Sequence, residues 1–130
     1  MDCPVCKEPM IVLELDRVEV DYCVSCRGIW LDSGELELLL EDSKERDDLF
    51  ASFKVDRSTK EKGRNCPICL KRMEKVLCGG DQPVRIDKCR RNHGIWLDEG
   101  ELEQILSMGR FDKDDRLPNL LRDMFGKKTE

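Results

Sequence analysis

Residues 94–103, Gly-Ile-Trp-Leu-Asp-Glu-Gly-Glu-Leu-Glu, repeat residues 28–37, Gly-Ile-Trp-Leu-Asp-Ser-Gly-Glu-Leu-Glu, with a single change. A Cys-Pro-x-Cys pair stands upstream of each copy, at residues 3–6 and at residues 66–69. An internal repeat has to be interpreted first, because each copy is one structural unit. The chain of 130 residues is therefore predicted to contain two small, related modules.

The size and composition of the chain indicate that packing alone does not stabilise these modules. Each repeat spans about 40–45 residues, a length that usually needs a metal, disulfides or a partner to fold. Only 5% of the residues are aromatic and 39% are charged, while eight are cysteines. We expect no signal peptide and no membrane span, because no suitable apolar run is present. In a cytoplasmic chain, paired cysteines favour metal binding over disulfides.

The first module offers four cysteines as ligands. Cys3 and Cys6 form one pair, and Cys23 and Cys26 form a second pair after residues 7–22. Two tight turns of this kind can close a tetrahedron of sulfurs at about 2.3 Å from one ion. Iron is the competing metal, since four thiolates suit both ions. Structural four-cysteine sites in small modules usually hold zinc, which we therefore predict here.

The second module offers three equivalent cysteines, Cys66, Cys69 and Cys89. Alignment on the shared Gly-Ile-Trp-Leu-Asp segment places Asn92, a poor zinc ligand, where the fourth cysteine should stand. His93, the only histidine of the chain, follows one residue later. Three cysteines and one histidine form a common tetrahedral set, so we predict a second Zn²⁺ ion and two per chain.

Cys78 is the alternative fourth ligand of this site. It lies in the connection between two predicted strands, at the expected far end of the hairpin, and is otherwise expected to be a partly exposed thiol. If neither Cys78 nor His93 binds the ion, water could take the fourth position, and a catalytic or redox site would result. No general base, pocket or catalytic motif accompanies such a site in the sequence. We therefore expect no enzymatic activity.

Each module is predicted to contain a hairpin and a helix. Alternating apolar residues or turn signals place the strands at residues 10–15, 18–22, 73–77 and 84–88. Asp32 and Asp98 are predicted helix N-caps, with a glutamate in the capping-box position three residues later. The first helix either continues as one long helix or breaks near Ser43. The motif glycine is expected to allow a left-handed turn, and the tryptophan to cover the metal site.

The chain is predicted to divide into four segments. These are the first module with its following helix (1–55), a linker (56–65), the second module with its helix (66–110) and a tail (111–130). The tail has apolar residues at the spacing of a short amphipathic helix, namely Leu117, Leu120, Leu121, Met124 and Phe125. This helix would either bind a partner or cover the second module.

The charge of the chain disfavours nucleic-acid binding. The formal net charge is −5, and thiolates bound to zinc would make it more negative. The one basic concentration surrounds the second metal site, and four of its residues are the candidate nucleic-acid contacts: Arg85, Lys88, Arg90 and Arg91. Three further basic residues, Lys71, Arg72 and Lys75, lie on or just before the preceding strand.

Both repeats resemble the transcription factor IIB-type zinc-ribbon family, with its pattern Cys-Pro-x-Cys … Cys-x-x-Cys-x-Gly-x-Trp-Leu-Asp-x-Gly-Glu-Leu. Asn92 departs from the all-cysteine pattern, although a His-Gly-x-Trp form such as residues 93–96 is also at home in the family. The resemblance implies a small, metal-stabilised α+β fold of two tandem zinc ribbons, each a zinc-knuckle hairpin followed by a helix. A role in transcription would follow by analogy only.

The function expected from the sequence is a non-enzymatic, zinc-binding adaptor module whose partner is another protein. A nucleic-acid-binding transcription regulator that uses the basic residues is the alternative. The sequence does not predict the oligomeric state.

Overall fold

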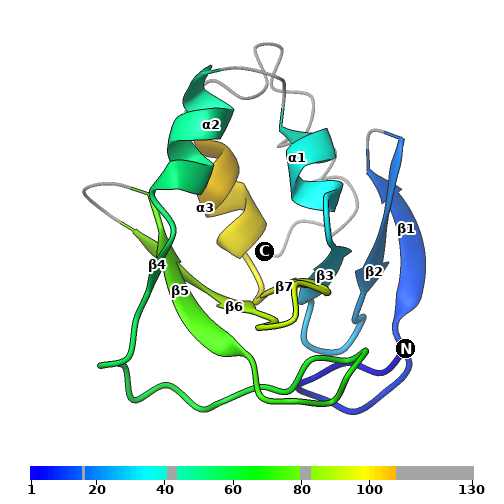
Figure 1. The fold of residues 1–130 in the computed structure, drawn as a ribbon. Coiled ribbons are helices and arrows are strands. Elements are labelled where there is room, and N and C mark those ends of the chain that lie inside the picture. Colours follow the sequence, from blue (N-terminus) through cyan, green and yellow to red (C-terminus); the bar gives the residue numbers. More distant parts are fainter. Residues whose placement is uncertain (16, 41–43, 80–82, 108–130) are drawn as a thin grey trace, which may run out of the picture.

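The computed structural model describes residues 1–15, 17–40, 44–79 and 83–107. It contains seven strands, β1 (Ile11–Leu15), β2 (Val18–Tyr22), β3 (Ile29–Asp32), β4 (Lys54–Val55), β5 (Glu74–Cys78), β6 (Val84–Lys88) and β7 (Gly94–Leu97). Three helices, α1 (Glu35–Leu39), α2 (Lys44–Ala51) and α3 (Glu101–Ser107), lie on one side of the sheet (Figure 1). None of the described helices has the length and apolar content needed to span a bilayer.

The two modules share one antiparallel sheet with the strand order β1-β2-β3-β7-β6-β5-β4. Each module supplies three strands in equivalent order, and the modules meet where β3 pairs with β7. In this pair Trp30 lies directly opposite Trp96, so the repeated motif pairs with itself. Such a self-complementary contact gives the two modules a local two-fold relation. The small α+β fold predicted from the sequence is thus confirmed, within a single sheet.

The two predicted hairpins are present. β1 and β2 pair as expected, and β2 alternates between buried and more exposed side chains. β5 begins one residue later than predicted and ends at Cys78. β3 and β7 were not predicted from the sequence. Their residues are buried from Ile29 to Leu31 and throughout β7. Strands in the middle of a covered sheet are buried on both faces and therefore lack the alternation by which strands are recognised.

The prediction that aspartates cap the helices was wrong. The N-cap of α1 is Gly34, with a φ of 92° and no side-chain cap. Asp32 instead accepts a hydrogen bond from the indole N–H of Trp30 at 2.7 Å, because a fully buried indole needs an acceptor. Glu35 still bonds the backbone N–H of Asp32 at 2.7 Å, as in a capping box.

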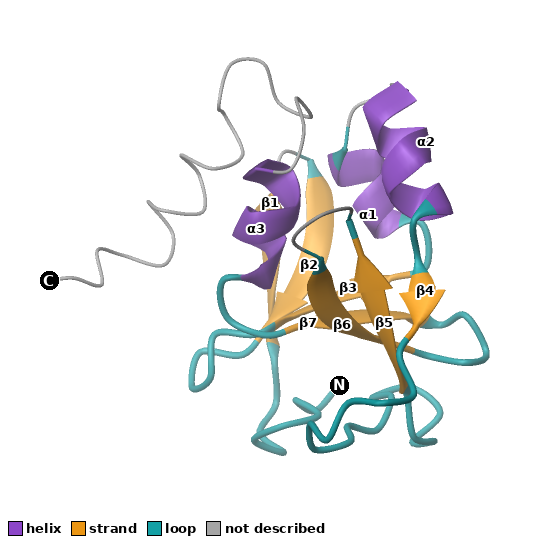
Figure 2. Cartoon of the chain, turned by 90° about the vertical axis from the view of Figure 1, so that its left-hand side faces the viewer, coloured by secondary structure: helices purple, strands orange, loops and turns teal. Residues whose placement is uncertain are grey.

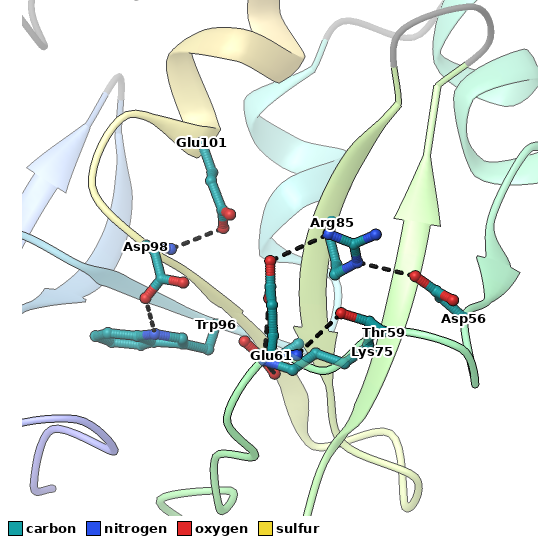
Figure 3. Close-up of polar contacts among 9 residues, drawn as sticks. Asp56, Thr59, Glu61, Lys75, Arg85, Trp96, Asp98 and Glu101 are labelled. Atoms are coloured by element: carbon teal, nitrogen blue, oxygen red, sulfur yellow. Dashed lines mark hydrogen bonds and ion pairs between the residues drawn. The ribbon is translucent and has the colours of Figure 1, made fainter.

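The second module repeats this arrangement around Trp96, Asp98 and Glu101 (Figure 3). The Asp98 carboxylate accepts the indole N–H at 2.9 Å, and Glu101 accepts the backbone N–H of Asp98 at 2.8 Å.

The helical segment of the first module consists of two helices. Leu40 is extended, with φ −87° and ψ 141°, so α1 ends at Leu39 and α2 begins at Lys44. The apolar faces of α1 and α3 pack onto the sheet in one core, which they supply with Leu36, Leu39, Leu102, Ile105 and Leu106.

The chain after α2 lies against the second module. β4 pairs with β5 at the edge of the sheet (Figure 2), and the predicted linker at residues 56–65 follows it. The backbone N–H of Asp56 bonds the carbonyl of Lys75 at 2.8 Å, and Asp56 also contacts Arg85 (Figure 3). The predicted amphipathic helix of the tail, Leu117 to Phe125, falls outside the described residues.

Candidate metal centres

The first four-cysteine set comes together on the side of the sheet away from the helices. The sulfurs of Cys3, Cys6, Cys23 and Cys26 all lie within 4.8 Å of one another. The Sγ atoms of Cys3 and Cys26 are 3.6 Å apart. Tetrahedral coordination at about 2.3 Å separates sulfurs by about 3.8 Å, whereas a disulfide needs about 2.05 Å. All eight cysteines are free, so this donor set fits a metal ion and not a disulfide pair.

The second set contains Cys66, Cys69, Cys89 and His93, whose ligand atoms also lie within 4.8 Å of one another. The Sγ atoms of Cys69 and Cys89 are 3.7 Å apart. His93 turns its Nδ1 toward the sulfurs, 3.5 Å from that of Cys89 and 3.9 Å from that of Cys66. The structure therefore brings the histidine favoured by the sequence to the three cysteines.

Cys78, the alternative ligand, lies elsewhere. It ends β5, belongs to the main apolar core and is fully buried, so the expectation of a partly exposed thiol was wrong. Its position on the inner face of the hairpin explains this burial, and burial raises the pKa of the Cys78 thiol to about 11. It belongs to neither set of metal ligands found among the described residues.

Three of the four cysteine loops share one backbone conformation. In each loop the residue after the second cysteine is left-handed, and its N–H bonds the carbonyl of the first cysteine. These residues are Lys7 (φ 65°), Arg27 (φ 64°) and Leu70 (φ 63°). The turn also directs backbone N–H groups at the first sulfur, as from Cys6 to Cys3 at 3.2 Å. Hydrogen bonds of this kind stabilise a thiolate.

The fourth loop differs by a shift of one residue without a change in length. Cys89 bonds the carbonyl of Gly94 at 3.0 Å, as Cys23 bonds that of Gly28 at 3.0 Å. The left-handed position, however, moves to Asn92, with a φ of 63°. Asparagine adopts this conformation more readily than most residues. The ligand moves with it to the next residue, from which the longer imidazole reaches the sulfurs.

Each tryptophan packs against the loop of the other module. Trp30 and Trp96 are fully buried in one cluster with cysteines of both sites. A Cβ atom on Gly28 would lie 2.1 Å from Trp96, and one on Gly94 would lie 2.2 Å from the backbone carbonyl oxygen of Leu31 and 2.7 Å from Trp30. The glycine was expected to allow a left-handed turn, but Arg27 takes that conformation in the first module. Gly28 instead makes room for the indole of Trp96, and Gly94 makes room for both the backbone of β3 and the indole of Trp30.

The surroundings of the thiols differ within each site. Burial raises the pKa of Cys66 to about 11. Burial also acts to raise the pKa of Cys89, but hydrogen bonds from the backbone N–H groups of His93 and Arg91 outweigh it and lower this pKa to about 7. At Cys23 burial likewise acts to raise the pKa, but hydrogen bonds from backbone N–H groups outweigh it, and the pKa is lowered. The first cysteine of each second loop is thus predisposed to the thiolate form that binds metal.

The basic residues of the second module are partly neutralised (Figure 3). Arg85 bonds Asp56 at 2.9 Å and Glu61 at 3.1 Å. Lys75 lies 2.7 Å from Asp87 and 3.5 Å from Glu61. The other predicted nucleic-acid contacts lie on β6 and on the fourth cysteine loop. Lys88 lines a cavity of about 150 Å³ beside α1, whereas Arg90 and Arg91 are exposed.

The predicted partner-binding residues of the tail, from Leu117 to Phe125, lie outside the described part of the chain. A family model described as transcription factor zinc-finger matches residues 2–42 and 65–108. Each matched segment contains one complete set of four ligands. Comparison with curated proteins gives no match, and neither does comparison with solved structures.

Proposed function

Because this chain belongs to the transcription factor zinc-finger family, we propose that it is a non-enzymatic adaptor whose two modules each bind one structural Zn²⁺ ion. The observation that carries the proposal is the presence of two complete four-donor sets on already formed loops. Zinc would link the two loops of each module and stabilise a fold whose apolar core is small. Residues 3, 6, 23 and 26 would hold one ion, and residues 66, 69, 89 and 93 the other.

A structural role is supported by the number of protein donors. Catalytic zinc usually has three protein ligands and an open position for water, whereas each set here offers four. His93 is the only histidine of the chain, and its assignment as a ligand leaves no other histidine to act as a general base. We therefore expect zinc to contribute stability and no reaction.

The partner would be another protein, bound at the cysteine loops. The apolar faces of α1 and α3 are buried against the sheet and are not available to a partner. Large aliphatic side chains are exposed on two of the four loops instead, namely Val24 (59%) on one, and Ile68 (46%) and Leu70 (71%) on the other. Apolar residues on a rigid, metal-held loop can bind a partner without a large ordering cost.

Affinity capture tests this surface. The zinc-loaded protein should retain a specific protein from its source cell, and Val24→Ser/Ile68→Ser/Leu70→Ser should lose it at unchanged thermal stability. Leu38→Ser is the matched control, because Leu38 is equally exposed at 71% but lies on α1. Equal capture by both variants would contradict binding through the loops.

The second candidate function is nucleic-acid binding, favoured by the exposure of Arg90 and Arg91 on the fourth loop. The ion pairs of Arg85 and Lys75 reduce the charge that the surrounding surface can offer to phosphates. Binding to short DNA or RNA duplexes that weakens steeply with salt, and is lost in Arg90→Glu/Arg91→Glu, would favour this candidate over a protein partner.

A further inference from the structure

The two modules differ most in how their outer edges are covered. In the second module β4 pairs with β5, and Val76 on the inner face of β5 is only 2% exposed. In the first module β1 has no strand on its outer side among the described residues. Leu13, the counterpart of Val76, is only partly buried, and Ile11 and Val12 are 46% and 61% exposed. An open, apolar edge strand of this kind is usually protected by another segment.

The second module is covered by α2, β4 and the segment that follows β4, which we call its cover. The segment after β4 carries charges opposite to those of the β5–β6 hairpin. β5 and β6 contain three basic and two acidic residues. The segment after β4 meets them with two acidic side chains, Asp56 and Glu61. Arg85 binds both of them, and Lys75 binds Glu61. Pairing of the edge strand and charge complementarity thus act together in holding this cover.

The hairpin of the first module has the reverse charge. β1 and β2 contain three acidic residues, Glu14, Glu19 and Asp21, and no basic ones. Glu14 and Glu19 lie directly opposite each other in the β1–β2 register. Like charges in a cross-strand pair are destabilising, so a basic segment placed here would relieve repulsion. Glu19 occupies the position that Arg85 takes in β6, where acidic residues bind.

The local two-fold relation indicates where such a segment would come from. The chain leaving α1 crosses to the other module, where Ser52 accepts the backbone N–H of Gly79 at 2.9 Å before β4 pairs with β5. The same operation, applied to the chain leaving α3, would lead toward β1. Residues 108–130 follow α3, and residues 117–130 carry the apolar pattern of the tail with three basic and two acidic residues.

We propose that the C-terminal segment 117–130 is the cover of the first module and packs against the β1 edge, as α2 and β4 cover β5. Its apolar residues meet Ile11 and Leu13. Its basic residues, Arg122, Lys127 and Lys128, face the opposed Glu14 and Glu19. This inference concerns a site different from the partner surface proposed above and does not depend on it.

Hydrogen exchange of the zinc-loaded full chain tests the proposal. The backbone amides of residues 11–15 should exchange about tenfold faster in a chain ending at Gly109, while those of residues 74–78 stay unchanged. Because the shortened chain could fail to fold, a second variant, Arg122→Glu/Lys127→Glu/Lys128→Glu, keeps the full length. It should show the same loss of protection in β1.

A charge swap makes the test specific. Combining the tail reversal with Glu14→Lys/Glu19→Lys should restore the protection of residues 11–15. The control Lys60→Glu/Lys62→Glu, on the cover of the second module, should leave β1 unchanged. Unchanged exchange in the tail-reversed chain would overturn the proposal. So would protection of β1 that grows with protein concentration, because the occupant would then be a second copy.

Discussion

The two modules bring four candidate metal donors together with a different residue in the fourth position. The first places Cys26 before a left-handed Arg27, and the second places His93 after a left-handed Asn92, in loops closed by the same hydrogen bond to a glycine carbonyl. The ligand and the left-handed residue have exchanged order without any insertion. A cysteine loop of this kind therefore tolerates a change of ligand, provided that the backbone conformation changes with it.

The two modules differ more in their outer hairpins than in the repeated motif around each tryptophan. The motif around each tryptophan keeps the same hydrogen bonds from indole to aspartate and from glutamate to backbone. Outside this motif, one hairpin is basic with an acidic cover, and the other is acidic with no strand on the outer side of β1 among the described residues. The shared motif forms the interface between the modules, which explains why its side chains cannot diverge freely.

Removal of the fourth ligand should have the largest effect and should be similar in both modules. His93→Ala and Cys26→Ala each leave three donors, and each should lose most of the binding energy of one zinc, which is about 10–16 kcal/mol for structural sites. Thermal unfolding followed by circular dichroism should show a melting temperature lower by more than about 10 °C in both variants.

Cys78→Ala is the matched control for these variants. It removes a buried thiol that lies in the core and should retain both ions, at a cost of about 1 kcal/mol. Loss of one zinc in Cys78→Ala, together with retention of both in His93→Ala, would make Cys78 the ligand and contradict the equivalence of the two sites.

Each tryptophan packs against the motif glycine of the other module. A larger residue in place of either glycine should therefore disturb the tryptophan of the other module. Gly28→Val should displace Trp96, and Gly94→Val should displace Trp30 together with the β3 backbone at Leu31, each at a cost of about 3 kcal/mol or more. Chemical denaturation measures the loss, and the fluorescence of the tryptophan in the other module should change.

Gly34→Ala separates crowding from backbone strain in this test. Gly34 is left-handed, with a φ of 92°, but has nothing within 4 Å of the added Cβ atom. It should lose only about 1 kcal/mol. Equal losses in Gly34→Ala and Gly28→Val would remove the argument that the glycines make room for the indoles.

The equivalent glutamates Glu35 and Glu101 should differ in their contribution to pH dependence. Burial raises the pKa of Glu101 from 4.5 to about 8 and that of Glu35 by less. At a pH between 4.5 and about 8, Glu101 is more often protonated in the folded protein than in the unfolded chain. Its contribution to the free energy of unfolding therefore falls as the pH rises from about 5 to 8.

Glu101→Gln should therefore stabilise the zinc-loaded protein at pH 8 by about 1–2 kcal/mol, a value reduced for partial solvent exposure. The gain should vanish near pH 5. Glu35→Gln should gain less at every pH. Chemical denaturation of the unmodified protein and of both variants between pH 5 and pH 8 measures the free energy of unfolding. A larger gain in stability in Glu35→Gln than in Glu101→Gln would contradict the prediction.

The left-handed loop residues give the smallest expected effect. Arg27→Asn should stabilise the first module by about 0.5 kcal/mol, and Asn92→Arg should destabilise the second by a similar amount, because asparagine adopts this conformation at lower cost. Urea denaturation of both variants measures the difference. Destabilisation by Arg27→Asn, or stabilisation by Asn92→Arg, would contradict the equivalence of the two loops.

The sequence predicted the parts of the fold that depend on local patterns. The hairpins followed from alternation in segments such as Val18–Tyr22. The two groups of candidate donors that the structure brings together followed from cysteine spacing and from alignment of the repeats. β3 and β7 could not be predicted, because a buried run of four residues carries no period. The pairing of Trp30 with Trp96, and the contacts of Asp56 and Glu61 in a segment expected to be a linker, arise from tertiary packing.

Both modules are proposed to be closed zinc sites, although their fourth ligands differ. Native mass spectrometry of the protein, purified without added metal, measures the zinc content of each chain. We expect two zinc ions per chain, retained together until a chelator or acid removes them. A single zinc ion, with the second set of ligands empty, would contradict the equivalence of His93 and Cys26.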